Sequence, residues 1–453
     1  MSTFTHTAAD ERSQTFIRPR RTTVTRVIAG SLTVGAVSAL VLVLAVFPGA
    51  TESVITGSML LAFGLGWAMM AALSTRLTEQ PQRWATVPAV AMTATGAGLV
   101  VAAPANETLT ALTWVWPPAL LVMVAWMFKQ MRRTLTGRGR WLLTPVFVVL
   151  AVASVGALVQ NLTTDRNHDA FGAPGALYSV GDHRLHLDCR GQGSPTVVLF
   201  NGLGEISASW AKVTGQLGSY TRVCAYDRAG QAWSDDLDGV QDGIEAAKDL
   251  HVLLATAGEQ GPFVLVGHSI GGPYAMTYAS RYPEQVAGMV LLDSSSPRQL
   301  TDIPSYPTQY AVMRRGYAVL PVLVRLGAGG LVAAGAGYPA DVADTLRAMT
   351  STPRAARNAR DEITTVPRVF DQAQALTTLD DAPLVVLTAS GTVETTEGWA
   401  AAQDQLAELS TNRIHLDVDS SHQGLVDDDD AAAKSAHAVD LVVDAIRSRV
   451  ALG

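Results

Sequence analysis

The sequence predicts an α/β domain, with a mostly parallel sheet covered by helices on both faces, preceded by an all-helical membrane region. Three observations predict this fold class. Apolar stretches, each close to the ~20 residues that cross a bilayer, fill the chain before residue 161. Beyond it, strand-like and helix-like segments alternate. Between one such strand and one such helix lies a Gly-x-Ser-x-Gly motif at residues 267–271.

The charge of the chain changes sign between these two parts. Charged residues make up 16% of the sequence, below the roughly 25% usual for soluble domains. Residues 1–160 hold 12 Lys or Arg and 5 Asp or Glu, a net charge of +7, and the remainder carries −14. An acidic second part argues against nucleic acid as a partner.

The membrane region, residues 27–160, contains five apolar stretches: 27–47, 54–73, 85–103, 112–128 and 141–160. Five consecutive stretches separated by short polar loops predict about five transmembrane helices rather than buried core helices. No Asp, Glu, Lys, Arg or His lies within them. Because intramembrane ionisable residues mark ion and substrate pathways, their absence favours a membrane anchor over a transporter.

Basic residues predict the orientation of this region. Lys and Arg gather in the N-terminal segment 1–26 and in the loops after the second and fourth stretches, whereas the charged residues of the other two loops are Glu52 and Glu107. This alternation places the N-terminus in the cytoplasm. Five crossings then place residue 161 onward outside it, so we expect an integral membrane protein with an extracytoplasmic α/β domain. The first stretch has too many successors to be a cleaved signal peptide.

A polar linker, 161–176, leads into the α/β domain, 177–453. Alternating side chains around turn residues predict a hairpin at its start, and continuous apolar runs predict central strands. The expected elements are, in order, strands 177–180, 184–189 and 196–200, helix 210–217, strand 222–226, helix 244–257, the strand that enters the motif from residue 264, helix 274–282, strands 287–292, 384–388 and 413–418, and helix 429–450. The sheet does not need residues 296–380, and this segment predicts helices at 310–324 and 341–349.

The motif Gly267-His268-Ser269-Ile270-Gly271 has the layout of a nucleophile elbow, in which a strained turn between a strand and a helix presents a serine. Glycine is needed at both ends because a side chain there would collide with the neighbouring strand or helix. The motif alone also fits an ordinary strand-to-helix turn. The strand before it, the helix after it and a suitable histidine downstream favour the elbow.

A serine nucleophile needs a base to take its proton. His422 lies directly after the strand-like segment 413–418, and we expect it to be that base. Three other histidines fit structural positions better: His437 in the final helix, His415 in the preceding strand, and His268, whose side chain leaves the elbow in another direction.

Four segments together resemble the α/β-hydrolase superfamily of serine esterases and lipases, from residue 177 to the end of the sequence. They are Asn201-Gly202-Leu203-Gly204, Tyr226-Asp227-Arg228-Ala229-Gly230, the elbow with Gly272 after it, and Ser421-His422. The resemblance implies the α/β-hydrolase fold with a helical cap, and an oxyanion hole formed by the backbone N–H groups of Leu203 and Ile270. Asn201 and Ala232 depart from it, because many members have histidine and glycine at these positions.

Two carboxylates remain open as the third member of a Ser-His-acid triad. The family's usual position, in the loop after strand 384–388, offers Glu394. Some members of the family instead place the acid where this chain has Asp293, at the end of strand 287–292. Sites in open α/β sheets are built at the carboxyl ends of strands, so we favour Asp293.

The two cysteines, Cys189 and Cys224, both lie in the α/β domain. The family's strand order makes their strands neighbours, so the resemblance implies a disulfide between them, which an oxidising compartment permits. The alternative is a pair of buried thiols.

These observations predict a membrane-anchored serine hydrolase that acts on small-molecule or lipid-like carboxylic esters, with Ser269, His422 and Asp293 as its triad. The same groups would serve an acyltransferase, and a catalytically silent ligand-binding or sensor protein is the alternative from another class. No cluster of residues has metal-ligand spacing, so neither a metal nor an organic cofactor is implied.

The apolar stretch 311–334 belongs to the predicted cap and contains Arg314, Arg315 and Arg325. It is expected to form a lid over the site. A second hypothesis is that it touches the outer membrane surface and admits lipid-like esters.

Overall fold

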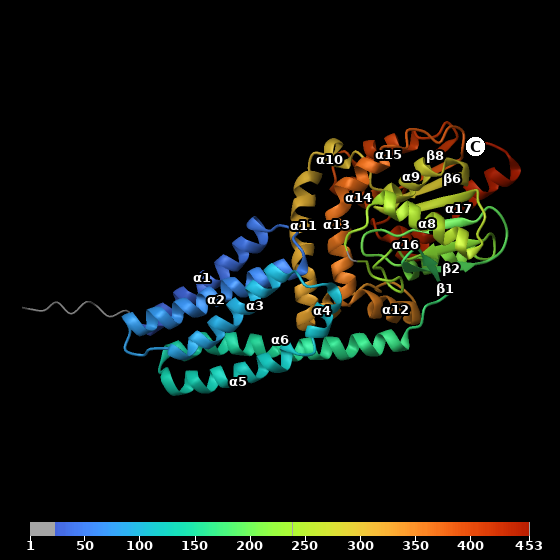
Figure 1. Ribbon diagram of the computed structural model, residues 1–453. Coiled ribbons are helices and arrows are strands. Elements are labelled where there is room, and N and C mark those ends of the chain that lie inside the picture. Colours follow the sequence, from blue (N-terminus) through green and yellow to red (C-terminus); the bar gives the residue numbers. More distant parts are fainter. Residues whose placement is uncertain (1–22, 238, 453) are drawn as a thin grey trace, which may run out of the picture.

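The computed structural model describes residues 23–237 and 239–452, which form a helical bundle beside a domain built around one sheet (Figure 1). Most of the predicted basic segment 1–26 lies outside the described residues. The bundle contains α1 (Val24–Val41) with its extension η1 (Leu42–Val46), α2 (Glu52–Leu77), η2 (Arg83–Ala85), α3 (Thr86–Ala102), α4 (Asn106–Leu112), α5 (Trp116–Thr134) and α6 (Arg138–Ala170).

Four of the described helical segments are long and apolar enough to cross a membrane: α1 with η1, α2, η2 with α3, and α6. α4 and α5 would make a fifth together, bent by 43°. The predicted fourth stretch, 112–128, is therefore not one straight helix. Its break has a local cause, because Pro117 and Pro118 lie in the first turn of α5, where a missing backbone N–H costs least.

The predicted linker, 161–176, is also different in the structure, because α6 continues through it as far as Ala170. The residues that end a helix, Gly172, Pro174 and Gly175, all lie beyond that point. The last membrane-length helix thus reaches the sheet domain directly, and only a short turn separates it from the first strand.

Small residues let the first three helices approach closely. A Cβ atom on Gly57 of α2 would lie 2.7 Å from the carbonyl oxygen of Gly96 in α3, and one on Gly66 would lie 2.8 Å from that of Ser31 in α1. Such close backbone contacts are typical of helices that pack within membranes.

The sheet has eight strands in the order β1-β2-β4-β3-β5-β6-β7-β8. β1 and β2 form an antiparallel hairpin, β2 pairs antiparallel with β4, and all later pairs are parallel. The strands are β1 (Ala176–Val180), β2 (His183–Arg190), β3 (Val197–Phe200), β4 (Val223–Tyr226), β5 (Phe263–His268), β6 (Val286–Leu292), β7 (Leu384–Ala389) and β8 (Arg413–Val418).

Helices bury both faces of the sheet, because successive residues of a strand point to opposite faces. Val198 and Phe200 of β3 pack on the side of α8 (Gly243–Ala257), α9 (Gly271–Arg281) and α15 (Trp399–Ala407). Val197 and Leu199 pack on the side of α7 (Ala211–Leu217) and α17 (Asp429–Ser448). This double burial explains the unbroken apolar runs of the central strands.

The cap lies between β6 and β7, and its elements are α10 (Gln299–Asp302), α11 (Tyr306–Leu323), η5 (Val324–Ala328), η6 (Gly329–Leu331), α12 (Ala340–Thr350) and α13 (Pro353–Ala373). The two predicted cap helices correspond to α11 and α12. α13 was not predicted from the sequence. Pro367 lies inside it, and a proline ordinarily ends or kinks a helix. The hydroxyl of Thr352 caps its start by accepting a hydrogen bond from the N–H of Ala355.

α11 forms a wall between the bundle and the sheet domain (Figure 1). One of its faces, which includes Tyr310 and Tyr317, packs against the core of the sheet domain. Another face, which includes Ala318 and Val322, packs against Ile55 of α2. The cap is therefore held by the membrane-length helices on one side and by the sheet domain on the other.

α6 also touches the cap, through Gly156. A Cβ atom there would lie 2.5 Å from the carbonyl oxygen of Leu326 in η5.

We expect Gly156→Val to lower the free energy of unfolding by about 1–3 kcal/mol, because a well-packed interface has no room for the added atoms. The thermal midpoint of the full chain in detergent measures this change. Gly98→Val is the matched control, because its Cβ position meets no atom of another helix within 4 Å, and equal midpoints for the two variants would contradict the packing described.

Candidate active site

Ser269 lies at a sharp turn between β5 and α9. Its φ of 54° is in the left-handed region, which is uncommon for a residue with a side chain. The turn is held by its neighbours: a Cβ atom on Gly271 would collide with the carbonyl of Phe200 in β3, and one on Gly267 would lie 2.6 Å from the Cα atom of Gly272. The expected reason for glycine on both sides of the serine is therefore visible in the structure.

Asp293 lies at the carboxyl end of β6, beside the strand that leads to Ser269, and its side chain is fully buried. Its Oδ2 atom is 2.6 Å from Nδ1 of His422, which lies in the loop after β8. It also accepts hydrogen bonds from the Thr392 hydroxyl at 2.6 Å, the Trp399 indole N–H at 2.7 Å and the backbone N–H of Ala389 at 3.1 Å.

The hydrogen bonds keep Asp293 ionised. Burial disfavours its charge, but the hydrogen bond and charge of His422, together with the other donors, more than offset this and lower the pKa of the carboxyl. Glu394, the alternative carboxylate, lies in α14 (Ser390–Thr395), where it is exposed and its side chain makes no hydrogen bond with another described residue. The structure thus brings Asp293, and not Glu394, to His422.

Two backbone donors for an oxyanion were predicted, the N–H groups of Ile270 and Leu203. Ile270 precedes the first turn of α9, and Leu203 lies in the loop after β3. Neither N–H donates a hydrogen bond to another described residue, whereas buried N–H groups are ordinarily paired. Both N–H groups are therefore free to bind an acceptor.

Glu205 and His268 form a buried pair that the sequence analysis did not identify. Oε1 of Glu205 is 2.7 Å from Nδ1 of His268, and Nε2 of His268 is 3.0 Å from the carbonyl oxygen of His422. The carboxylate also accepts hydrogen bonds from the N–H of Gly202 at 2.5 Å and from the Gln423 amide at 2.9 Å. One carboxylate thus joins the loop after β3, the turn at Ser269 and the loop of His422.

This pair is ionised. Each ring nitrogen of His268 faces an oxygen acceptor, so both nitrogens must carry a proton for both bonds to form. Burial alone would raise the pKa of Glu205, but the charge and hydrogen bond of His268 outweigh it and lower the pKa to about 2. Burial alone would lower the pKa of His268, and the Glu205 carboxylate instead raises it.

Asn201, which stands where the resembling family often has histidine, is fully buried. Its side-chain amide donates to the carbonyl of Tyr226 at 2.9 Å and to Gln231 at 3.0 Å, and its oxygen accepts from the Trp210 indole at 2.9 Å. The asparagine therefore fixes the start of the loop that holds Leu203.

A second buried ion pair connects this loop to the cap. Arg228 is 2.7 Å from Glu362 of α13, and Oε2 of Glu362 is 3.3 Å from the N–H of Gly204.

Ala232, the other departure from the family pattern, has a φ of 31°, so it occupies a left-handed position that favours glycine.

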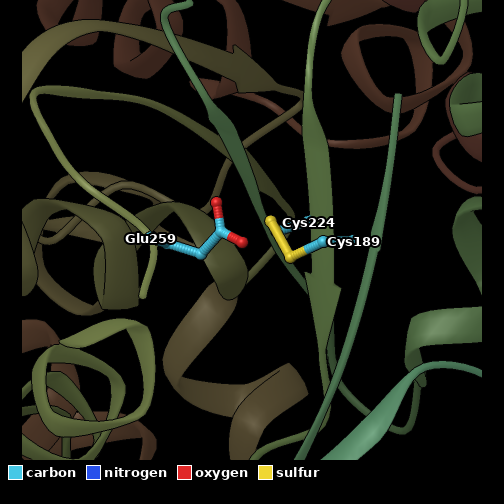
Figure 2. A group of neighbouring side chains, drawn as sticks. All are labelled: Cys189, Cys224 and Glu259. Carbon is cyan, nitrogen blue, oxygen red and sulfur yellow. A yellow bond between two sulfur atoms is a disulfide. The ribbon is translucent and has the colours of Figure 1, made fainter. Parts of the chain in front are cut away.

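Cys189 of β2 and Cys224 of β4 lie opposite each other in the sheet and are joined by a disulfide (Figure 2). Glu259 lies close to both, and the three donor atoms fall within 4.8 Å of one another (Figure 2). This is not a set of free metal ligands, because the sulfur atoms are bonded to each other. Arg222 moreover holds both oxygens of Glu259, at 2.5 and 2.8 Å.

Comparisons with known proteins agree with this architecture. Residues 195–318 match the family described as alpha/beta hydrolase fold. Among solved structures, the Cif epoxide hydrolase from Acinetobacter nosocomialis superposes with a TM-score of 0.50 at 16% identity, over 62% of this chain and 95% of that one. The predicted fold class is thereby confirmed.

Curated relatives match the chain in part. An uncharacterized protein of Schizosaccharomyces pombe is 29% identical over 236 residues, 45% of this chain and 42% of that protein. A pimeloyl-acyl-carrier-protein methyl ester esterase of Shewanella woodyi is 35% identical over 124 residues, 27% of this chain and 44% of the esterase. The chain thus spans less than half the length of these relatives.

The ionised pair predicts a pH-dependent stability difference between the wild type and Glu205→Gln. Glu205 contributes to the free energy of unfolding above its unfolded pKa of 4.5, and this contribution is lost as pH falls towards 2. His268 contributes below its unfolded pKa of 6.5, and this contribution is lost as pH rises through its raised folded pKa. We therefore expect the wild type to have a larger free energy of unfolding than Glu205→Gln, by roughly 3–5 kcal/mol because the variant breaks a buried pair. This difference should be largest between pH 4.5 and 6.5.

Thermal unfolding of the full chain in detergent from pH 4 to pH 9 measures this difference. Glu394→Gln, at an exposed carboxylate, is the control and should show no such maximum. A difference between wild type and Glu205→Gln that stays constant from pH 5 to pH 9 would mean that the pair is not ionised.

Proposed function

We propose that this chain, an α/β hydrolase joined to a region of membrane-length helices, is a membrane-anchored serine hydrolase that cleaves carboxylic esters. The observation that carries the proposal is the hydrogen bond of 2.6 Å between His422 and the buried Asp293, beside the left-handed turn at Ser269. A base oriented by a carboxylate, next to a serine on a strained turn, is the arrangement that activates a hydroxyl.

The roles of the groups follow from their bonds. The Nδ1–H group of His422 donates to Asp293, which leaves the Nε2 lone pair of the imidazole to take the proton of Ser269. The serine oxygen then bonds to the ester carbonyl carbon, and the N–H groups of Leu203 and Ile270 stabilise the oxyanion. His422 returns the proton to the leaving alcohol as its C–O bond breaks, and water releases the acyl group by the same steps.

A fluorophosphonate probe tests the proposal on the full chain in membranes, because it bonds only to an activated serine. We expect no labelling of Ser269→Ala, and labelling about 10⁴-fold slower in Asp293→Asn, where the base loses the correct tautomer. Glu394→Gln is the matched control and should be labelled like wild type. Normal labelling of Asp293→Asn together with slow labelling of Glu394→Gln would assign the acid to Glu394, and an unlabelled wild type would argue against a hydrolase.

The α/β domain is proposed to lie outside the cytoplasm. The alternation of basic and non-basic loops supports this orientation, as does an odd number of crossings, with α4 and α5 counted as one bent span. The disulfide between Cys189 and Cys224 also supports it, because disulfides persist in oxidising compartments.

The proposed substrates are lipid-like esters at the bilayer surface. The cap touches the membrane-length helices, and beyond α11 it exposes apolar side chains, with Leu331 88% and Val332 43% exposed. Because α11 packs against both the bundle and the sheet domain, it would hold the site close to the lipid headgroups. Exposed apolar residues at that level fit contact with the bilayer.

We expect Leu331→Asp to lower the hydrolysis of a long-chain ester in nanodiscs about tenfold, the effect of losing roughly 1.5 kcal/mol of apolar burial in the bilayer. Hydrolysis of a short water-soluble ester should not change. Val450→Asp, at an exposed apolar residue near the C-terminus, is the matched control for the added charge. Equal losses for both esters would show that Leu331 acts on the fold rather than on access to lipid.

A further inference from the structure

η1 and the loop that joins it to α2, residues 47–51, lie against three arginines of the cap. Arg360 of α13 donates from Nη1 to the carbonyl of Ala50 at 3.2 Å. Arg315 of α11 donates from Nε to the carbonyl of Leu44 at 2.9 Å. Arg314 lies across Gly49, whose φ of 76° lets the chain turn away, and a Cβ atom there would collide with the guanidinium group.

This junction between the cap and the bundle carries more positive than negative charge. The pairs are Arg325 with Glu52 and Arg360 with Asp361. Arg314 and Arg315 have no carboxylate partner among the described residues. Four guanidinium groups thus face two carboxylates, and the junction is suited to an anion.

The guanidinium groups of Arg314 and Arg360 also have N–H donors that lack a hydrogen-bond acceptor. Arg360 is 5% exposed, and its Nε atom is buried with no hydrogen-bond partner. The Nε atom of Arg314 is likewise buried and unpartnered, and no other hydrogen bond of its guanidinium group to a described residue is present. A buried donor that lacks an acceptor is costly, and these two lie beside consecutive residues, Gly49 and Ala50.

The position of the junction identifies the source of the anion. It lies where two membrane-length segments end, at Val46 and at Glu52. Just before it, the bundle exposes apolar side chains, including Leu44 at 39% and Val46 at 52%. Lipid phosphates lie directly beyond the hydrocarbon region, and arginine binds phosphate oxygens with paired, charge-assisted hydrogen bonds.

We infer that Arg314, Arg315 and Arg360 bind the phosphate of an anionic membrane lipid at this junction. The inference rests on the membrane placement proposed above and adds a second ligand site, separate from Ser269. α13 carries Glu362, which contacts the loop of Leu203, two residues after Arg360. A lipid at the junction therefore steadies the helix that forms one wall of the proposed catalytic site.

The test measures lipid binding to the full chain in dodecylmaltoside micelles, by native mass spectrometry and by the thermal midpoint. Dioleoylphosphatidylglycerol is the probe, dioleoylglycerol is the matched lipid without phosphate, and inorganic phosphate is the soluble anion. We expect phosphatidylglycerol to bind and to raise the midpoint, and Arg314→Gln to weaken that binding about tenfold or more, the effect of losing a charged hydrogen bond. The guanidinium group of Arg314 makes no hydrogen bond or ion pair with a described residue, so the variant should fold.

Arg347→Gln is the control, because Arg347 is an exposed arginine of α12 paired with Asp344. Equal binding of the two lipids to wild type, or unchanged binding in Arg314→Gln, would overturn the inference. A rise of the midpoint with inorganic phosphate equal to that with phosphatidylglycerol, and dependent on Arg314, would overturn the lipid as the source. Fluorophosphonate labelling of Ser269 in the same samples reports separately on the proposed hydrolase, so the two proposals fail independently.

Discussion

The left-handed backbone at Ser269 is the constraint on which the rest of the site depends. Such a conformation costs of order 1–3 kcal/mol and persists only where the surroundings fix it. Here Gly267 packs against Gly272 and Gly271 packs against β3 so closely that neither position has room for a side chain. The same turn holds Ser269, leaves the N–H of Ile270 unpaired and starts α9, so one backbone feature positions both the proposed nucleophile and a proposed oxyanion donor.

Buried charges hold the other loops against this turn. The pair of Glu205 and His268 joins the loop after β3 to the loop of His422, and Glu362 continues the connection into α13. On its other side, α13 reaches the bundle through Arg360. The bundle is therefore connected to the framework of the site through α13.

The sequence predicted the features that depend on local pattern. Strands buried on both faces give unbroken apolar runs, so their bounds were predicted to within about one residue, and the positions of Ser269, His422 and Asp293 at strand ends followed from them. The pairing of Glu205 with His268 joins residues far apart in the sequence, and no local pattern indicates it. α13 and the continuation of α6 were missed because Pro367 and the polar composition of 161–170 are typical of helix ends, whereas packing against the cap and the bundle overrides that preference.

The most direct test of a serine hydrolase is to trap its acyl-enzyme. The full chain would be incubated with a p-nitrophenyl ester, quenched in acid within the first turnover, digested and analysed by mass spectrometry. The proposed mechanism predicts the mass of the acyl group on the peptide that contains Ser269, and no acylated peptide or ester cleavage in Ser269→Ala. Ester cleavage that persists in Ser269→Ala, or an acyl group on another residue of the wild type, would contradict it.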